Sequence, residues 1–363
     1  MLAAMDVFGN PSSLHSAGLD AEKLIRQARE RVYAALSIKN PDGYRVIFTS
    51  SGSEANNQLL FGVANAKNYR FTPRIVTTDS EHPSILEPLA ALEKRGVEVV
   101  RLSTKNGALD LSELRAAITP STVLLSIMTV NNETGAIYDL KAAFSLAKRL
   151  NPNIITHTDC VQGFLKVPFS PEILLCDAIS LSAHKIHGPK GVGALVLAKP
   201  LITAKRVLPL IYGGGQESGL RSGTENTLGI VGFGAAAEDT AKRFSLFRDT
   251  APRLRAAFLA ALPESVQVNT PIAYAPHIIS ITLPRLRSET VLHFLSARGI
   301  FVSSGSACAS NKKGSNYVLP AFGLDEAAVD TTLRISLSAD TTEDELLTCA
   351  SAIQDAIDSL IKK

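Results

Sequence analysis

The sequence predicts an α/β protein, in which a large domain with a mostly parallel, seven-stranded sheet flanked by helices precedes a smaller α+β domain. Short runs rich in β-branched residues alternate with amphipathic stretches rich in Ala, Leu, Lys and Glu. Strands that alternate with helices in this way are typical of βαβ units. From about Gly229 the alternation gives way to long helical stretches and few extended runs. We therefore expect a large domain at residues 8–245 and a small C-terminal domain at residues 246–363.

The individual elements follow from these runs. The expected strands of the large sheet are Val46–Thr49, Ile75–Thr78, Val97–Leu102, Val123–Met128, Ile154–Thr158, Ala178–Leu181 and Gly193–Leu197. The expected helices between them are Ala21–Leu36, Glu54–Ala66, Ile85–Lys94, Leu111–Ala117 and Leu140–Leu150. The second part predicts helices at Gly229–Phe244, Arg253–Leu262, Glu289–Ala297 and Glu343–Leu360, with strands at Ile278–Leu283 and Thr332–Leu337. Ligands of such sheets bind at the carboxyl ends of the strands, so chemistry should lie just after each run.

Composition excludes several classes of protein. The 363 residues are 45% hydrophobic and 20% charged, which excludes a wholly disordered chain. A net charge of +3 gives no support for nucleic-acid binding, and no apolar run approaches the ~18 residues of a membrane span. Four cysteines without a CxxC pair predict a reducing, cytoplasmic location and no metal site. We expect Cys160, Cys176 and Cys349 to be buried thiols.

Two charged residues follow expected strands and could carry chemistry. Lys185 lies in Ser182-Ala-His-Lys-Ile-His-Gly-Pro-Lys-Gly191, among small and polar residues. A lysine near a pocket can form a Schiff base, although an isolated lysine is more often solvated. Asp159 ends an earlier strand, where a carboxylate could keep a pyridinium nitrogen protonated or could cap a helix.

A third segment, Phe48-Thr-Ser-Ser-Gly-Ser-Glu54, reads as a strand, a turn and a helix start. Backbone N–H groups at a helix N-terminus can bind phosphate. The segment lacks both the GxGxxG pattern and the nucleotide P-loop, so it suits a monophosphate, or it is an ordinary capped helix.

Seven motifs together resemble the pyridoxal-phosphate-dependent cysteine desulfurases, in the aminotransferase class V group of fold type I enzymes. The motifs occur in family order: Phe48–Asn57, Glu81-His82, Val130–Gly135, Asp159–Gln162, Ser182–Gly191, Arg221–Asn226 and Ser303–Cys308. The resemblance runs from about Phe8 to the C-terminus. It implies the fold type I architecture, the cofactor pyridoxal 5'-phosphate and a homodimer.

The resemblance also implies a role for each matching residue. Lys185 would bind the cofactor as a Schiff base and act as the base, Asp159 would pair with the pyridine nitrogen, and His82 would stack on the ring. The remaining cofactor contacts would come from Gly52, Ser53, Asn132, Gln162, Ser182, His184 and, toward the neighbouring subunit, Thr224. Arg334 would bind the substrate carboxylate, with Asn132 nearby; without the resemblance it reads as a surface cation.

Cys308 is the expected sulfur acceptor. It lies among Ser, Gly and Ala, ahead of Lys312 and Lys313, which could lower the pKa of its thiol. The resemblance implies conversion of L-cysteine to L-alanine, with a persulfide left on Cys308. The form Ser-Ser-Gly-Ser-Ala-Cys resembles the long-loop subgroup, which delivers sulfur to iron–sulfur scaffolds or other acceptors. A selenocysteine lyase is the close alternative.

One departure from the family lies at the N-terminus. Family members usually begin with a strand that carries Tyr-Leu-Asp-Asn-Ala-Ala-Thr-Thr, whereas this chain has eight residues before Gly9-Asn-Pro. The absent segment lines the active-site entrance in relatives and packs on the small domain. Either this sequence starts too late, or the protein is shortened. A second hypothesis is therefore a shortened paralogue that binds cofactor and partners but turns over weakly.

Overall fold

The computed structural model describes residues 1–66, 69–304 and 316–361. The chain divides into two compact units, which are described separately. Unit 1 comprises residues 1–102, 111–129 and 139–242, and unit 2 comprises residues 103–110, 130–138 and 243–363. The domain boundary at residues 245 and 246 stays a prediction.

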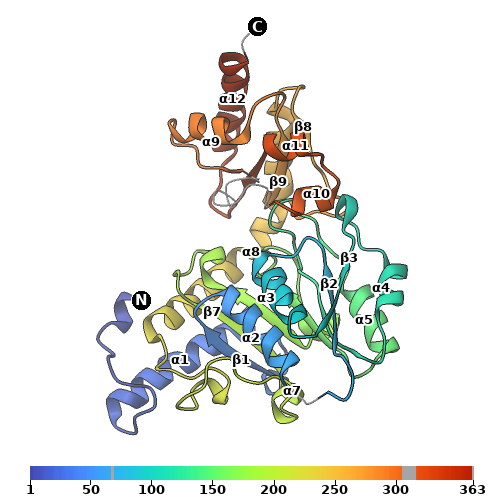
Figure 1. Cartoon of the computed structure of the whole chain (residues 1–363). Helices are drawn as coiled ribbons and strands as arrows, with labels where there is room; N and C mark the ends of the chain where they lie inside the picture. Colours follow the sequence, from blue (N-terminus) through green and yellow to red (C-terminus); the bar gives the residue numbers. More distant parts are fainter. Residues whose placement is uncertain (67–68, 305–315, 362–363) are drawn as a thin grey trace. The chain divides into compact units, whose positions relative to one another are not determined.

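Unit 1 is built on a seven-stranded sheet (Figure 1). Its strands are β1 (Tyr44–Thr49), β2 (Arg74–Thr78), β3 (Glu98–Leu102), β4 (Thr122–Ser126), β5 (Ile155–Asp159), β6 (Ala178–Ser182) and β7 (Gly193–Ala198). They lie in the order β1-β7-β6-β5-β4-β2-β3. Only β7 pairs antiparallel with its two neighbours, and the pairs among β2 to β6 are parallel. The predicted mostly parallel, seven-stranded sheet is confirmed.

All residues of the central strands β4, β5 and β6 are buried, as is typical of a sheet that helices cover on both faces. The helices of unit 1 are α1 (Ser16–Ala35), α2 (Gly52–Ala64), α3 (Pro83–Glu93), α4 (Leu111–Ala117), α5 (Leu140–Leu150), α6 (Pro171–Leu174) and α7 (Lys199–Thr203). Short 3-10 helices lie at Leu2–Ala4, Pro41–Gly43, Ala183–Ile186 and Glu217–Gly219. Leu59 and Leu60 of α2 and Leu89 of α3 pack with Ile47 and Leu124 in one apolar core. The helical periodicity of α2 and α3 thus places their apolar faces on the sheet.

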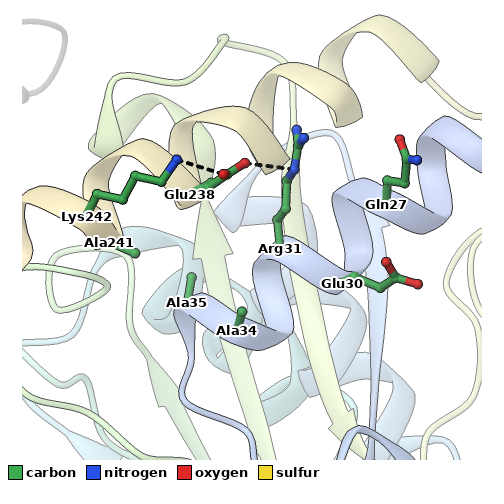
Figure 2. A pocket seen from close by; sticks show the side chains of 8 residues that line it. All are labelled: Gln27, Glu30, Arg31, Ala34, Ala35, Glu238, Ala241 and Lys242. Atoms are coloured by element: carbon green, nitrogen blue, oxygen red, sulfur yellow. Dashed lines mark hydrogen bonds and ion pairs between the residues drawn. The ribbon is translucent and has the colours of Figure 1, made fainter.

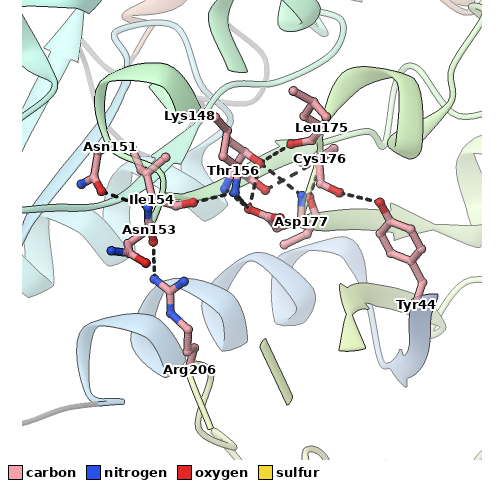
Figure 3. A network of polar contacts seen from close by, with 11 residues as sticks. Tyr44, Lys148, Asn151, Asn153, Ile154, Thr156, Leu175, Cys176, Asp177 and Arg206 are labelled. Atoms are coloured by element: carbon pink, nitrogen blue, oxygen red, sulfur yellow. Dashed lines mark hydrogen bonds and ion pairs between the residues drawn. The ribbon is translucent and has the colours of Figure 1, made fainter. Parts of the chain in front are cut away.

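A polar network connects the starts of β5 and β6 (Figure 3). Asp177, just before β6, accepts hydrogen bonds from the backbone N–H and the hydroxyl of Thr156 at 2.9 and 3.0 Å. The ammonium of Lys148, from α5, forms an ion pair with the same carboxylate oxygen and donates to the carbonyl of Ile154 at 2.7 Å. Tyr44 donates to the carbonyl of Cys176 at 3.1 Å. The amino end of the sheet is therefore held by satisfied polar groups.

The long helix α8 (Thr227–Ala261) begins in unit 1 and ends in unit 2. It is continuous through Pro252, where the sequence predicts two separate helices. A proline inside a helix removes one backbone hydrogen bond and disfavours the preceding turn, but tertiary packing can override this local preference. Along its length Phe233 and Phe258 are fully buried, so the helix has apolar contacts on both sides of the proline.

Unit 2 contains a four-stranded antiparallel sheet in the order β10-β11-β9-β8. Its strands are β8 (Gln267–Val268), β9 (Ile278–Thr282), β10 (Ser303–Ser304) and β11 (Thr332–Ser336). Its further helices are α9 (Ser288–Ser296), α10 (Val318–Phe322), α11 (Glu326–Thr331), α12 (Glu343–Leu360) and a 3-10 turn at Lys105–Gly107. Ile279, Ile281 and Leu333 pack against Ile353 of α12 in the core of this unit. Among the described residues, no helix is both long and apolar enough to cross a bilayer.

Candidate active site

The carboxyl ends of the strands in unit 1 place most of the predicted site residues at one edge of the sheet. Asp159 is the last residue of β5, and His82 follows β2 as the N-cap of α3. Lys185 lies in the 3-10 helix Ala183–Ile186 directly after β6, and Gly52 begins α2 shortly after β1. Because these strands run in the same direction, their ends share one edge. The topology therefore brings together residues that are far apart in sequence.

Asp159 is a buried carboxylate held by two neutral N–H donors. Its side chain is 5% exposed. Asn56 of α2 donates from its amide to Oδ2 at 2.8 Å, and the backbone N–H of Val161 donates to Oδ1 at 3.0 Å. The Asn56 amide also donates to the hydroxyl of Ser84 in α3 at 2.8 Å. Two helices therefore fix the orientation of this carboxylate, which leaves its charge without direct neutralisation by a cation in these contacts.

His82 lies in the electrostatic field of two other predicted site residues. Its Nδ1 accepts the backbone N–H of Ser84 at 3.1 Å, as an N-cap, and contacts the Ser84 hydroxyl at 2.8 Å. Burial lowers the pKa of the His82 imidazole, Asp159 raises it, and Lys185 lowers it. The lowered pKa favours the neutral ring, and these interactions place His82, Asp159 and Lys185 near one another.

Glu81, directly before His82, is completely buried at the same edge. Its Oε1 accepts the hydroxyl of Thr78 at 2.8 Å and the backbone N–H of Met128 at 2.9 Å. Burial raises the pKa of Glu81 to about 8; Asp159 raises it further, whereas the two hydrogen bonds lower it. A protonated Glu81 at neutral pH would keep a second negative charge away from Asp159.

The start of α2 has the geometry of a cradle for an anion. Ser51 caps the helix by accepting the N–H of Glu54 at 3.1 Å, and within the described residues the N–H groups of Gly52 and Ser53 have no hydrogen-bond partner. A Cβ atom on Gly52 would lie 2.8 Å from a methyl group of Val161. A Cβ atom on Gly193 would lie 2.5 Å from the backbone of Ser51. Two close backbone approaches thus leave the helix N-terminus without side-chain cover.

The remaining predicted site residues of unit 1 are polar and lie at or just after the ends of β5 and β6. The Ser182 hydroxyl and Nδ1 of His184 are 2.8 Å apart. Burial lowers the pKa of His184, and the charges of Lys185 and two further lysines lower it more. Gln162 accepts a hydrogen bond from Lys166 at 3.3 Å. A neutral histidine beside a hydroxyl, at the start of a cationic segment, is a suitable donor pair for a phosphate group.

Two predicted residues, Asn132 and Arg334, lie together in unit 2. Arg334 of β11 donates to the backbone carbonyl of Asn132 at 2.9 Å and to the hydroxyl of Ser303 in β10 at 2.9 Å. The side-chain Oδ1 of Asn132 is buried without a hydrogen-bond partner among the described residues. An orphaned buried amide oxygen of this kind is suited to a ligand group that is not part of the chain.

Thr224 lies apart from these groups, on the surface of unit 1. It lines a pocket of about 230 Å³ together with Ser50, Gly191 and Arg221. Arg221 forms an ion pair with Glu54 of α2 at 2.9 Å, which holds this pocket beside the first turn of that helix.

A larger groove of unit 1, about 700 Å³, lies between α1 and α8 and contains none of the predicted site residues (Figure 2). Glu238 accepts a hydrogen bond from Lys242 at 2.8 Å and forms an ion pair with Arg31 at 3.0 Å, and three alanines also line the groove. Hydrogen bonding by Lys242, with Arg31 close by, lowers the pKa of Glu238. Its charges are thus paired with one another, and the groove lacks a group suited to catalysis.

The remaining predictions fall outside these groups. Cys308 lies outside the described residues, so the structure does not place it. Cys160, Cys176 and Cys349 are buried, as predicted. Burial raises the pKa of Cys160 to about 12 and of Cys349 to about 11, which makes both thiols unreactive near neutral pH.

Sequence reasoning assigned no role to Asn56 or Glu81. Both lie inside motifs that the sequence singles out. An amide on the otherwise apolar face of α2 and a carboxylate next to a strand end are signals that could have identified them.

Comparisons with known proteins agree with this arrangement. The family model of the aminotransferase class-V enzymes matches residues 3–348. The cysteine desulfurase IscS of Clostridium botulinum is 39% identical over 347 residues, covering 93% of this chain and 85% of that protein. A cysteine desulfurase of a Nostoc species is 38% identical over 351 residues, covering 94% and 84%.

Solved structures are also similar. A NifS-like protein superposes with a TM-score of 0.90 at 34% identity, covering 98% of this chain and 93% of that one. The structure of SspA in complex with cysteine superposes with a TM-score of 0.79 at 32% identity, covering 93% of both chains.

Proposed function

Because the chain belongs to the aminotransferase class-V family and, within it, to the cysteine desulfurases, we propose that it converts L-cysteine to L-alanine and retains the sulfur on Cys308. The observation that carries this proposal is the buried Asp159, oriented by Asn56 and Val161 and close to His82 and to the charge of Lys185. A fixed carboxylate beside a lysine and a neutral imidazole is the set that pyridoxal-phosphate chemistry requires of a protein.

The class-V family implies the cofactor pyridoxal 5'-phosphate, and the residues present fit it. The open N-terminus of α2, the orphaned Oδ1 of Asn132 and the buried Asp159 each offer the partner that one part of this molecule needs. When bound, the cofactor supplies an electron sink for bond breaking at the substrate Cα. The residues that would hold it are Gly52, Ser53, His82, Asn132, Asp159, Gln162, Ser182, His184 and Lys185, with Thr224 serving the neighbouring subunit of a homodimer.

Each side chain would then have a distinct task. Asp159 would keep a ring nitrogen protonated, and the neutral His82 would pack against the ring face without adding charge. Lys185 would bind the cofactor and, once released by substrate, remove the proton from Cα. Arg334 would bind the substrate carboxylate, as a guanidinium suits that geometry.

The sulfur step balances without an external oxidant. The thiolate of Cys308 attacks the sulfur of the bound cysteine, so that an S–S bond forms as the Cβ–S bond of the substrate breaks. The carbon fragment takes up a proton and leaves as alanine, and Cys308 carries a persulfide. Lys312 and Lys313 lie close in sequence and would favour the thiolate.

The persulfide would serve a sulfur acceptor. The motif Ser303-Ser-Gly-Ser-Ala-Cys308 resembles the long-loop subgroup, which supports an iron–sulfur scaffold or another thiolation acceptor as the partner. Cys308 must be a free thiol before each turnover, and a reducing compartment keeps thiols in that form, which supports a cytoplasmic location.

The test measures alanine and sulfide released from L-cysteine in the presence of a reductant. Wild-type protein should release equal amounts, and Lys185→Ala should lower both by about 10³-fold or more, because the base is removed. Cys308→Ser should also abolish both. Lys141→Ala, which removes an exposed lysine of α5, and Cys349→Ala, which removes a buried thiol, should retain turnover.

Other outcomes would overturn the proposal. A cofactor-loaded wild type that releases neither product would support a shortened paralogue with a binding role. Turnover of selenocysteine that survives in Cys308→Ser, while cysteine turnover is lost, would support a selenocysteine lyase.

A further inference from the structure

Unit 2 contains a tight turn, Asn131–Gly135, that its own hydrogen bonds make rigid. Oδ1 of Asn131 accepts the backbone N–H groups of Glu133 and Thr134, both at 2.9 Å, and the Thr134 hydroxyl at 3.1 Å. Gly135 has a φ of 75°, and a Cβ atom on it would lie 2.9 Å from the carbonyl oxygen of Ile278. Only glycine fits there without strain, so the turn has one conformation.

Arg334 links this turn to Ser303, which lies five residues before Cys308. We call residues 305–315, which lie outside the described residues, the Cys308 segment. Ser303 of β10 is paired with Arg334 of β11 in the sheet register. Arg334 donates to the Ser303 hydroxyl and, through its other terminal nitrogen, to the Asn132 carbonyl, each at 2.9 Å. Ser303, which precedes the Cys308 segment, is thus connected to the turn through Arg334.

The next residue of the same turn contacts the chain just after the Cys308 segment. The Asn316 amide donates to Oε2 of Glu133 at 3.0 Å. Oδ1 of Asn316 accepts the N–H of Leu319, in the first turn of α10, at 3.1 Å. Burial raises the pKa of Glu133, whereas Asn316 and the charge of Arg334 lower it. The described residues on either side of the Cys308 segment therefore connect to adjacent residues of a single turn, Asn316 directly to Glu133 and Ser303 through Arg334 to Asn132.

We propose that Glu133 is a positioning residue for sulfur transfer, because it holds Asn316, the residue at which the described chain resumes after residue 315, on this turn. The inference rests on the proposed desulfurase function. Glu133 does not contact the reacting atoms in this assignment. Its carboxylate sets where the chain resumes after residue 315, while Arg334 sets where it departs after residue 304. Displacing a reacting group by about 1 Å can cost about 10²-fold in rate.

The experiment separates positioning from substrate binding. Single-turnover formation of the Cys308 persulfide is measured by mass spectrometry, and the KM for L-cysteine is measured separately. Glu133→Ala should slow persulfide formation by about 10- to 100-fold and change the KM by less than about threefold. Glu133→Gln keeps an acceptor for the Asn316 amide and should restore the rate to within about threefold of wild type.

Asn316→Ala supplies the second variant, which should slow persulfide formation as Glu133→Ala does. The double variant should be no slower than the worse single one, because both remove the same contact. Glu264→Ala, an exposed carboxylate of the same unit, is the matched control and should leave the rate unchanged.

A readout without turnover is the rate at which iodoacetamide alkylates Cys308 in the absence of cysteine. Glu133→Ala and Asn316→Ala should raise this rate by at least about threefold relative to Glu264→Ala, because one attachment is lost. Equal alkylation and equal persulfide rates in Glu133→Ala and Glu264→Ala would overturn the positioning role. A wild type that forms no persulfide would overturn the proposed function instead, and the alkylation rates would still test Glu133.

Discussion

Strands β5 and β6 are buried along their whole length, but the carboxylate at their amino ends and the carboxylate at their carboxyl ends have different surroundings. At the amino end, Asp177 is surrounded by the ammonium of Lys148 and two donors of Thr156 (Figure 3). At the carboxyl end, Asp159 accepts hydrogen bonds from neutral N–H groups, and the carboxylate lies close to His82 and to the charge of Lys185. The first arrangement pairs a carboxylate with a cation, and the second orients a carboxylate through neutral donors.

The two ends of the sheet therefore contribute to different properties, the amino end to stability and the carboxyl end to the proposed chemistry. Paired groups at the amino end stabilise the fold because their hydrogen bonds are satisfied. A buried charge with little neutralisation is unfavourable for folding, but it is available to a ligand that brings its own positive charge. A matched pair of carboxylate-to-amide substitutions can therefore test the comparison directly.

The largest effect should come from Asp159→Asn. The substitution removes the negative charge that would hold the cofactor's ring nitrogen protonated, so we expect alanine release to fall by about 10²- to 10³-fold. The urea midpoint of the cofactor-free protein should not fall, since no ion pair is broken. A variant that loses stability but keeps turnover would contradict this assignment.

Asp177→Asn should have the opposite profile. It leaves Lys148 without its partner carboxylate and weakens the Thr156 hydrogen bonds, so we expect a loss of about 1–3 kcal/mol in the free energy of unfolding. Turnover per folded molecule should stay within about twofold of wild type, since an effect of this kind acts on the fold alone. Urea denaturation and an alanine assay on the same preparation measure both, and a large fall in turnover would break the comparison.

The smallest effect concerns pH and Glu81. Its pKa is raised to about 8 in the folded state from 4.5, so the folded state binds its proton more tightly than the unfolded state does. The stabilisation from this group is present at low pH and is lost as pH rises toward 8, with a slope of at most about 1.4 kcal/mol per pH unit.

Glu81→Gln should remove this slope. The difference in stability between wild type and variant, measured by urea denaturation from pH 5 to pH 8.5, should shift in favour of the variant as pH rises. Glu264→Gln, at an exposed position, should produce no such change. Parallel pH profiles of wild type and Glu81→Gln would show that Glu81 is ionised throughout this range.

The fold could be predicted because its signals are local. The buried runs of β-branched residues at β2 and β5 predict strands without knowledge of their partners. Two-residue strands such as β8 and β10 leave no such pattern, and their existence depends on pairing with β9 and β11. The continuity of α8 through Pro252 likewise depends on tertiary packing rather than on local preference.

The candidate site could be predicted only in part, because its roles depend on contacts between distant residues. Asp159 and His82 were identified by their positions after strands and by family motifs. The hydrogen bond from Asn56 to Asp159 joins residues 103 positions apart, and that from Asn316 to Glu133 joins residues 183 apart. No periodicity encodes such pairs, so the structure was needed to find them.

The two glycines beside the N-terminus of α2, Gly52 of α2 and Gly193 of β7, have unequal evolutionary freedom. At Gly52, a methyl group would meet a side-chain tip of Val161, and a compensating Val161→Ala change could make room for it. At Gly193, an added Cβ atom would lie 2.5 and 2.8 Å from backbone atoms of Ser51 and Gly52. No second substitution can remove a backbone atom. A mutant library or an evolving lineage can therefore introduce a larger residue at position 52 in two substitutions. At position 193, no substitution of a neighbouring residue would make room for a larger side chain.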